Sequence, residues 1–315
     1  MNGVYTATVR QLLDIAPVVF ESPQFAIKGG TALNLFLHDL PRLSVDIDVV
    51  FTDHTLDRAT ALQAISSELR VISEKLEAMG YEVLLHRNTA NNESKLKVLS
   101  PLAEVKVEVN EIFRGTLLPL QQRPLSPATE EEFTQAVTLP LLATAELYGS
   151  KLVAAMDRQH PRDLFDVHVL YNDTGLTPEI VDCFVAYLAG HNRPVHEVLK
   201  PRLHPLQATF ANQFDGMTRE EISLDTLEQT RERLVQDLPR ALTNQHRTFL
   251  LSLVQDEPRW DCMPFAHLQE LPAIRWKLQN LAKLKGAKRA EQIQGLEACF
   301  QQEGGHSDAS LRRRQ

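Results

Sequence analysis

The chain has 315 residues, of which 43% are hydrophobic and 23% charged, and its formal net charge is −8. Its length is enough for two domains, and its composition is that of an ordinary soluble protein. The negative charge argues against general electrostatic binding to nucleic acid, but it leaves room for a local basic surface. Three widely separated cysteines argue against a zinc site or a disulfide framework. Because no apolar run reaches membrane-spanning length and the N-terminus has no secretion signal, we expect a cytoplasmic protein with no membrane partner.

The first part of the chain predicts alternating helices and strands. Apolar side chains at helical spacing predict helices at residues 4–20, 31–37 and 56–79, the last ending at Gly80. Short apolar or alternating runs predict strands at residues 25–27, 45–51, 81–85, 94–99 and 103–110. The last two strands form a hairpin, and residues 41–44 form a turn before the second strand.

The second part of the chain reads as helical. Proline and polar residues increase over residues 118–129, which predicts a change of domain there. Helices are expected at residues 142–158 and 163–171, and the remainder to residue 302 reads as helices with short breaks. Residues 303–315 predict a disordered basic tail.

The chemistry is concentrated around the run Val45-Asp-Ile-Asp-Val-Val50. Side chains two residues apart lie on the same face of a strand, so Asp46 and Asp48 share one face and apolar residues fill the other. Two like charges this close repel, and folding alone gives no reason to place them in an apolar strand. Mg²⁺ binds such carboxylates together with substrate phosphates. The pair therefore predicts a site for Mg²⁺ or Mn²⁺, although a solvated edge strand could carry two acids without a metal.

Lys28, Gly29 and Gly30 lie between a predicted strand and a predicted helix. Glycines at this position allow a tight turn and a close approach of the backbone, and a helix N-terminus binds phosphate well. Thr31, at the start of the helix, either contacts a phosphate or caps the helix. Most Gly-Gly pairs are simply turns, so this segment on its own favours a turn over a nucleotide site.

Glu108 is a third carboxylate, on the alternating strand at residues 103–110. On such a face a glutamate is usually exposed to solvent, here near Lys106. With the aspartate pair on a neighbouring strand it becomes a candidate metal ligand, because two metals, or one metal and a base, need about three carboxylates on adjacent strands. Glu104 shares its face and is the competing candidate.

A second group of charged residues runs from Lys151 to Asp166. Lys151 and Arg158 lie two turns apart on one helix face, and Asp163 and Asp166 share a face of the next helix. One interpretation is a salt-bridged pair of helices. The other is that Lys151, which lies in a mostly apolar helix, meets triphosphate oxygens and is oriented by one of the aspartates.

Together these motifs resemble the nucleotidyltransferase superfamily of DNA polymerase β type, which has a Gly-Gly or Gly-Ser loop, a [DE]h[DE] strand (h is apolar) and a later h[DE]h strand. More closely, KGGTAL…R.S.DID followed by EL..SK……R…RDLFDV resembles the AbiEii/AbiGii toxin family, which includes the mycobacterial MenT toxins. That family supplies the toxins of type IV toxin–antitoxin and phage abortive-infection systems, which act in antiviral defence. The resemblance covers residues 24–170, and from there on it rests on helical character and length.

The resemblance implies an α+β fold of mixed α/β character. Residues 1–125 would form a polymerase β-like nucleotidyltransferase domain with a small mixed sheet, and residues 126–302 a helical domain that contributes the Lys/Asp motif and binds the acceptor. The implied reaction moves NMP from an NTP to the 3′-hydroxyl of an RNA, most often the tRNA acceptor end, and releases pyrophosphate. Modifying that end would block translation.

The resemblance also implies a role for each motif residue. Metal ligands would be Asp46, Asp48 and Glu108, and the catalytic set would add Lys151, Asp163 and Asp166. The nucleotide-binding set would be Lys28, Gly29, Gly30, Thr31, Arg42, Ser44, Arg158 and Arg162. One departure is Asn34, where many relatives have arginine, and it leaves the choice of nucleotide open.

Other functions fit the same residues. The acceptor could be a protein hydroxyl or a small molecule, and a chain with this fold could be an inactive binding scaffold, although all three carboxylates are present here. A toxin also implies a cognate antitoxin as a partner. The sequence leaves open how that antitoxin acts and which oligomeric state the toxin adopts.

Overall fold

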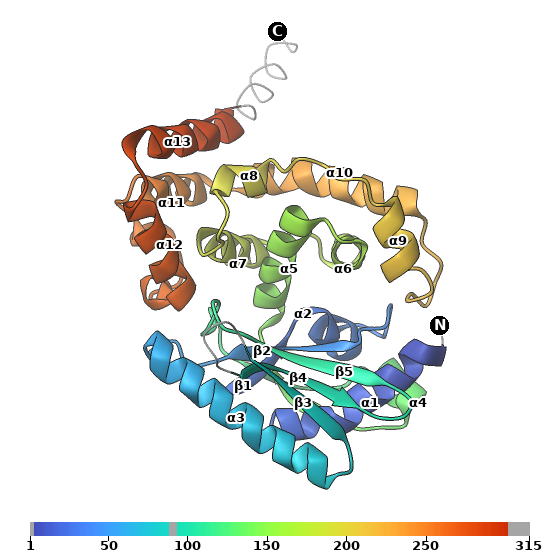
Figure 1. Ribbon diagram of the computed structural model, residues 1–315. Coiled ribbons are helices and arrows are strands. Elements are labelled where there is room, and N and C mark those ends of the chain that lie inside the picture. Colours follow the sequence, from blue (N-terminus) through green and yellow to red (C-terminus); the bar gives the residue numbers. More distant parts are fainter. Residues whose placement is uncertain (1–2, 88–92, 302–315) are drawn as a thin grey trace. The chain divides into compact units, whose positions relative to one another are not determined.

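The computed structural model describes residues 3–87 and 93–301. The predicted tail and the predicted turn at residues 91–92 lie outside these ranges. The chain forms two compact units (Figure 1). The first is built from the chain up to Leu147 and from Thr209–Ser223, and the second from Tyr148–Ala208 and from Leu224 onward.

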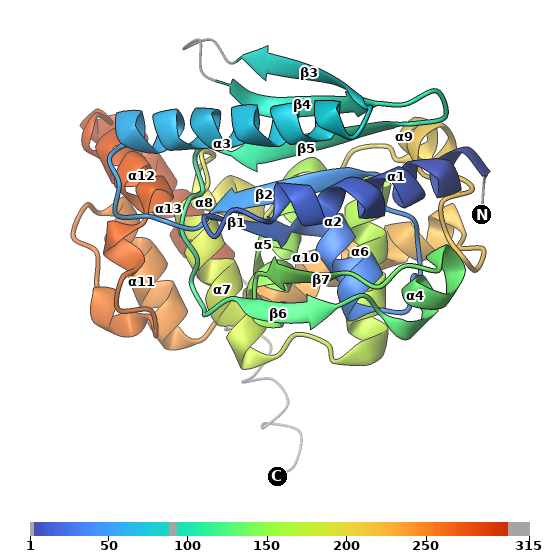
Figure 2. The same cartoon turned by 90° about the horizontal axis from the view of Figure 1, so that it is seen from below.

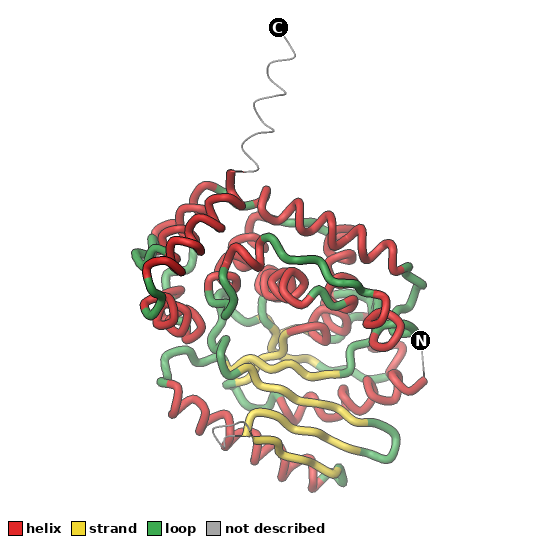
Figure 3. Tube along the Cα trace, turned by 45° about the horizontal axis from the view of Figure 1, so that its top comes forward, coloured by secondary structure: helices red, strands yellow, loops and turns green. Residues whose placement is uncertain are grey.

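The first unit is built on a mixed sheet, which has seven strands in the described ranges, in the order β3-β4-β5-β2-β1-β7-β6. β2 runs parallel to β5 and β1 parallel to β7, and the other neighbours are antiparallel. The strands are β1 Phe25–Lys28, β2 Asp46–Phe51, β3 Glu82–Arg87, β4 Glu93–Leu99, β5 Glu104–Asn110, β6 Gln121–Pro124 and β7 Thr138–Leu141. The predicted fold class, a mixed α and β fold with a mixed sheet, is confirmed (Figure 3).

Two long helices, α1 (Gly3–Val19) and α3 (Arg58–Ala78), pack against one face of this sheet (Figure 2). Alternation explains why: every second residue of β5 is buried, and Leu96 and Val98 of β4 are buried with them. α3 begins at Asp57, whose side chain accepts hydrogen bonds from the Ala59 and Thr60 amides. It ends before Gly80, which has a φ of +92°. The opposite face of β2, β4 and β5 carries the polar residues.

The structure has a helix at residues 31–37, as predicted, but most of it is not an α-helix. Its first turn is α2 (Gly29–Thr31), and the rest is a π-helix, η1 (Ala32–Leu37). The side-chain amide of Asn34 donates to the Gly30 carbonyl (2.8 Å), which is the acceptor that the Asn34 backbone uses in an α-helix. The His38 amide reaches back to the Leu33 carbonyl (2.9 Å), the wider spacing of a π-helix.

Residues 118–129, where the composition predicts a change of domain, contain β6 and the start of α4 (Pro127–Phe133). β6 pairs with β7, so the first unit continues past this segment. The last element assigned mainly to it is α9 (Gln207–Gln213). The division of roles predicted for the two parts of the chain stays a prediction.

The second unit is helical in its described residues, as expected. Its elements are α5 Thr144–Arg158, α6 Pro161–Asp173, α7 Pro178–Ala189, α8 Val195–Leu199, α10 Leu224–Ala241, α11 Asn244–Val254, η2 Trp260–Cys262, η3 Leu268–Glu270, α12 Pro272–Ala282 and α13 Gly286–Gln301. None of the helices in the described ranges is both long and apolar enough to cross a membrane.

A buried carboxylate links α3 to the β3–β4 edge of the sheet. Glu93 is only 2% exposed and accepts hydrogen bonds from the Ser66 hydroxyl, from Arg70 Nη2 (3.0 Å) and from Arg87 Nε (3.1 Å). These donors favour the charged form, the Ser66 hydroxyl most of all, and they lower the pKa of Glu93 from 4.5 to about 2. The ionised carboxylate therefore stabilises the folded state above pH 4.5, and this contribution is lost as the pH falls toward 2.

We predict that Glu93→Gln lowers the urea midpoint of unfolding at pH 7, and that the difference from the native protein narrows as the pH falls below 4.5. The matched control is Glu74→Gln, on the exposed side of α3. Its effect should be small and should not follow this pH dependence. A Glu93→Gln difference that stays constant from pH 7 to pH 3.5 contradicts the prediction.

Candidate active site

The two aspartates of β2 lie on one face of the strand. Asp46 and Asp48 are half-buried, whereas Ile47 and Val49 between and after them are completely buried in the core. The buried residues fix the orientation of the strand, because a one-residue slip would exchange its faces. Both carboxylates are therefore held on the face of the sheet that α1 and α3 leave open.

The register of the sheet brings further charges beside Asp48. Its Cα partner on the antiparallel strand β1 is Lys28, and its partner on the parallel strand β5 is Glu108. Partners in register point to the same face. Lys28, Asp48 and Glu108 thus form a row across three adjacent strands, and Glu104, the competing candidate, lies four residues from Glu108 at the other end of β5.

Side chains of the site lie against the backbone of both Gly29 and Gly30, where a Cβ atom would clash with them. Gly29 has a φ of +75°, and a Cβ atom there would lie 2.2 Å from Asp48 Oδ2. A Cβ atom on Gly30 would lie 2.6 Å from Arg42 Nη2 and 3.1 Å from Ser44 Oγ. The close approach that the sequence predicts therefore exists, and the nearest group in the structure is the Asp48 carboxylate. The predicted contact with phosphate stays a prediction.

Thr31 of α2 and two residues of the loop before β2 form hydrogen bonds around the start of β2. The Thr31 hydroxyl donates to the Asp46 carbonyl oxygen (2.5 Å). The distance between Thr31 Oγ1 and Ser44 Oγ is 2.9 Å, also within hydrogen-bonding range. Arg42 is 2% exposed, and its Nη1 donates to the Leu43 carbonyl. These three residues, which the resemblance assigns to nucleotide binding, are buried, Thr31 at the end of α2 and Arg42 and Ser44 in the loop before β2. Their hydrogen bonds hold the backbone around the carboxylates.

The third carboxylate is engaged by a lysine. Glu108 Oε2 lies 2.7 Å from Lys95 Nζ, and the Glu108 side chain is 57% exposed. Among the residues that the structure describes, no three His, Cys, Asp or Glu side chains are gathered closely enough to hold a metal ion. The Asp46–Asp48 pair nevertheless fits Mg²⁺, because its oxygen donors are hard and this ion commonly takes one or two carboxylates plus substrate phosphates.

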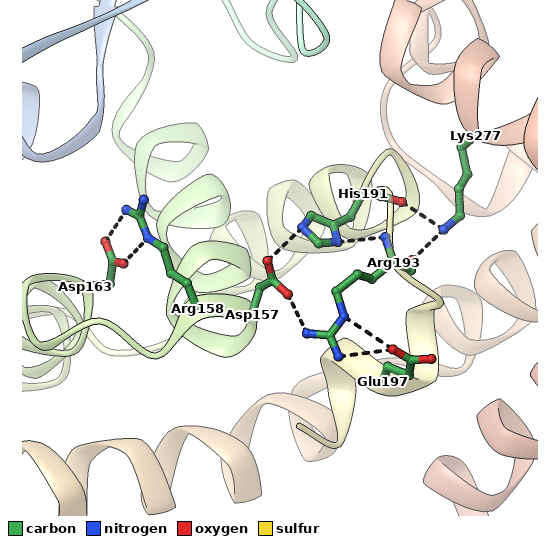
Figure 4. Close-up of polar contacts among 7 residues, drawn as sticks. All are labelled: Asp157, Arg158, Asp163, His191, Arg193, Glu197 and Lys277. Atoms are coloured by element: carbon green, nitrogen blue, oxygen red, sulfur yellow. Dashed lines mark hydrogen bonds and ion pairs between the residues drawn. The ribbon is translucent and has the colours of Figure 1, made fainter. Parts of the chain in front are cut away.

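The second predicted group forms a buried ion cluster in the second unit. Lys151 Nζ lies 2.9 Å from both Asp163 Oδ1 and Asp166 Oδ2, and all three residues are at most 6% exposed. Arg158 Nη2 donates to Asp163 Oδ1 (2.9 Å) from a side chain that is 62% exposed. Figure 4 shows this pair. The contacts fit the interpretation as salt-bridged helices, and the catalytic roles predicted for these residues stay predictions.

Burial and the neighbouring cations shift the pKa of Asp163 in opposite directions. Burial alone would raise the pKa of its carboxyl group, but Lys151 and Arg158 outweigh burial and hold the pKa well below its usual range. At the start of α6, His160 Nδ1 accepts from the amide of Arg162, whose side chain is half-buried. The α5–α6 corner is therefore fixed by both a cap and an ion cluster.

A neighbouring network has no counterpart in the sequence analysis. Asp157, next to Arg158, contacts Arg193 Nη1 (2.6 Å) and His191 Nε2 (3.4 Å), and Lys277 Nζ donates to the carbonyls of His191 (2.8 Å) and Arg193 (2.6 Å) (Figure 4). Burial lowers the pKa of Lys277 to about 8. Arg193 also pairs with Glu197. The network ties the α7–α8 connection to α5 and α12 over sequence separations that no local pattern reveals.

Comparison with known proteins agrees with these motifs. The family described as "Nucleotidyl transferase AbiEii toxin, Type IV TA system" matches residues 11–280. The fold is similar to the solved structure of MenT4, a nucleotidyltransferase toxin from Mycobacterium tuberculosis H37Rv, with a TM-score of 0.55 and 19% sequence identity over 86% of this chain and 93% of that one. No curated protein matches the chain.

We predict that Gly29→Ala destabilises the protein more than Gly175→Ala. Both glycines have positive φ angles, +75° and +68°, and alanine in that conformation costs about 1–2 kcal/mol. Only Gly29 also meets a neighbour, Asp48 Oδ2, whereas nothing lies within 4 Å of a Cβ atom on Gly175. Equal shifts in the thermal unfolding of the two variants would show that the contact with Asp48 is absent.

We also predict that Lys151→Met lowers the stability by about 3–5 kcal/mol, because it leaves two buried carboxylates without their shared cation. Arg158→Met removes a mostly exposed partner of the same Asp163 and should cost about 1 kcal/mol or less. Circular dichroism during urea unfolding measures both. A Lys151→Met protein as stable as the native one contradicts a structural role for this cluster.

Proposed function

Because the chain belongs to the AbiEii family of nucleotidyltransferase toxins of type IV toxin–antitoxin systems, we propose that it transfers a nucleoside monophosphate from an NTP to the 3′ end of an RNA, with tRNA as the favoured acceptor. The observation that carries the proposal is the β2 carboxylate pair, held on the sheet face opposite α1 and α3 with the side-chain-free backbone of Gly29 against Asp48. This arrangement supports the proposal because it holds two oxygen donors for a cation on one face of the strand, and such a cation would neutralise the phosphates of an NTP.

In the proposed reaction the RNA 3′-hydroxyl oxygen attacks the α-phosphorus of the NTP. A new P–O bond forms, the bond between the α-phosphorus and its bridging oxygen breaks, and pyrophosphate leaves. Asp46 and Asp48 would hold Mg²⁺, or Mn²⁺ in its place, which when bound neutralises phosphate charge. Gly29 and Gly30 have no Cβ atom, which lets the side chains of Asp48, Arg42 and Ser44 pack directly against their backbone.

Glu108 is the group best placed to take the proton of the attacking hydroxyl. It is the cross-strand partner of Asp48 and is more than half exposed, so a substrate hydroxyl can reach it. Its carboxylate is held by Lys95 in an exposed ion pair, and such pairs are worth about 0–1 kcal/mol. Glu108 can therefore leave Lys95 for a substrate proton or a second cation at little cost.

We predict that the purified protein, incubated with total tRNA, Mg²⁺ and each labelled NTP in turn, transfers label into RNA with a subset of the NTPs. Asp48→Asn should reduce this transfer by at least about a hundredfold, because it removes a charged ligand of the group that neutralises phosphate. The unfolding temperature of Asp48→Asn is measured beside the activity, so that a loss of transfer is assigned to the site only in a folded protein.

The outcomes of this experiment separate the alternatives. Label that enters RNA with the native protein alone supports the proposal and identifies the nucleotide. Label that enters protein or a small molecule instead, with the same loss in Asp48→Asn, keeps the site and replaces the acceptor. Equal labelling by both proteins contradicts the assignment of Asp48.

A further inference from the structure

Two lysines face each other beside the aspartate pair. Lys97 on β4 is the Cα partner of Lys106 in the antiparallel β4–β5 pair, and Lys106 is the partner of Asp46 in the parallel β2–β5 pair. The three residues form a row next to the row that contains Asp48 and Glu108. Because residues two apart on a strand share a face, both rows lie on the same side of the sheet.

This side of the sheet is accessible in the first unit. α1 and α3 cover the opposite face, where Leu96, Val98, Val105 and Val107 are buried. The side chains of Lys97 and Lys106 are 29% and 48% exposed. Both ammonium groups can therefore reach a ligand that approaches Asp46.

The two lysines share one carboxylate. Glu104 lies 2.9 Å from Lys97 Nζ but 4.0 Å from Lys106 Nζ, so it satisfies the first far better than the second. Lys95, one row away, has a carboxylate of its own, Glu108, at 2.7 Å. Like charges directly opposite each other on paired strands are destabilising. Lys106 lies between Asp46 on one neighbouring strand and Lys97 on the other, so two positive groups are gathered directly beside the aspartate pair.

We propose that Lys97 and Lys106 form a subsite for phosphate groups of a bound substrate, beside Asp46. Lysine binds phosphate oxygens as a compact point charge, and two such charges attract successive phosphates. The inference rests on the proposed function and identifies the surface of the first unit that receives the phosphates. They belong either to the backbone of the RNA acceptor or to the triphosphate of the NTP, and both have the same chemistry at the lysines.

The test uses Lys97→Gln and Lys106→Gln in the full-length protein. One arm measures the binding of a fluorescently labelled single-stranded RNA oligonucleotide by anisotropy over a range of KCl concentrations. The other measures the binding of each NTP with Mg²⁺ by calorimetry. If the lysines contact RNA phosphates, each variant should weaken binding several-fold and lower the slope of log affinity against log salt by about 0.7.

Two controls separate a phosphate contact from a change in net charge or fold. Lys75→Gln removes the same charge from α3, on the other side of the sheet, where Lys75 pairs with Glu21 at 2.6 Å. It should leave both affinities unchanged. Lys97→Arg and Lys106→Arg keep the charge and should retain binding. The unfolding temperatures of the two glutamine variants are measured as well, because Lys97→Gln also removes the ion pair with Glu104, and partly exposed pairs of this kind stabilise a fold only weakly.

Weaker binding in the RNA arm alone assigns the subsite to the acceptor, and weaker binding in the NTP arm alone assigns it to the triphosphate. If both glutamine variants match Lys75→Gln in both arms, the subsite is disproved. A native protein that binds NTP but no RNA contradicts the RNA acceptor of the proposed function, while the NTP arm still tests the subsite. Failure of the two proposals can therefore be told apart.

Discussion

Asp46 and Asp48 repel each other on one face of a strand whose other face is completely buried, so neither side chain can turn into the core. The surrounding backbone is arranged around this pair. Gly29 adopts a left-handed conformation with no side chain against Asp48, and the Thr31 hydroxyl fixes the carbonyl of Asp46. Arg42 and Ser44 pack against Gly30 in the same way. Residues of α2 and of the loop before β2 therefore surround the aspartate pair on this face of the sheet.

The strands that carry the site and the aspartate pair could be predicted from the sequence, because the patterns that indicate them are local. The alternation in β5, the apolar neighbours of the aspartates and the Gly-Gly pair each span only a few residues. Glu108 could be nominated by its type and its position on an alternating strand. Its pairing with Asp48 could not, because register between strands 60 residues apart (48 and 108) depends on the packing of the whole sheet.

Other features could not be predicted from the sequence, for physical reasons. Pro124 and Pro140 obscure β6 and β7, because proline is expected only in edge strands or at strand ends, and β6 is an edge strand here. The network of Asp157, His191 and Lys277 joins three helical regions, and each member alone looks like an ordinary surface residue. In the π-helix the side-chain amide of Asn34 donates to the Gly30 carbonyl, a contact that no local sequence pattern predicts.

The two charged groups of the protein differ in how their charges are balanced. In the second unit, Lys151 lies equally close to Asp163 and Asp166, and Arg158 adds a second cation, so opposite charges alternate within the cluster. On the sheet face of the first unit, like charges also occur side by side, Asp46 with Asp48 and Lys97 with Lys106. Across the strands, however, Lys28 opposes Asp48 and Lys106 opposes Asp46, so acids and bases alternate there too. A nucleotide with its metal ion matches both groups, since the cation would bind the acids and the phosphates would bind the lysines. The gathering of both kinds of charge on this one face, more than any single residue, is the physical argument for placing the chemistry there.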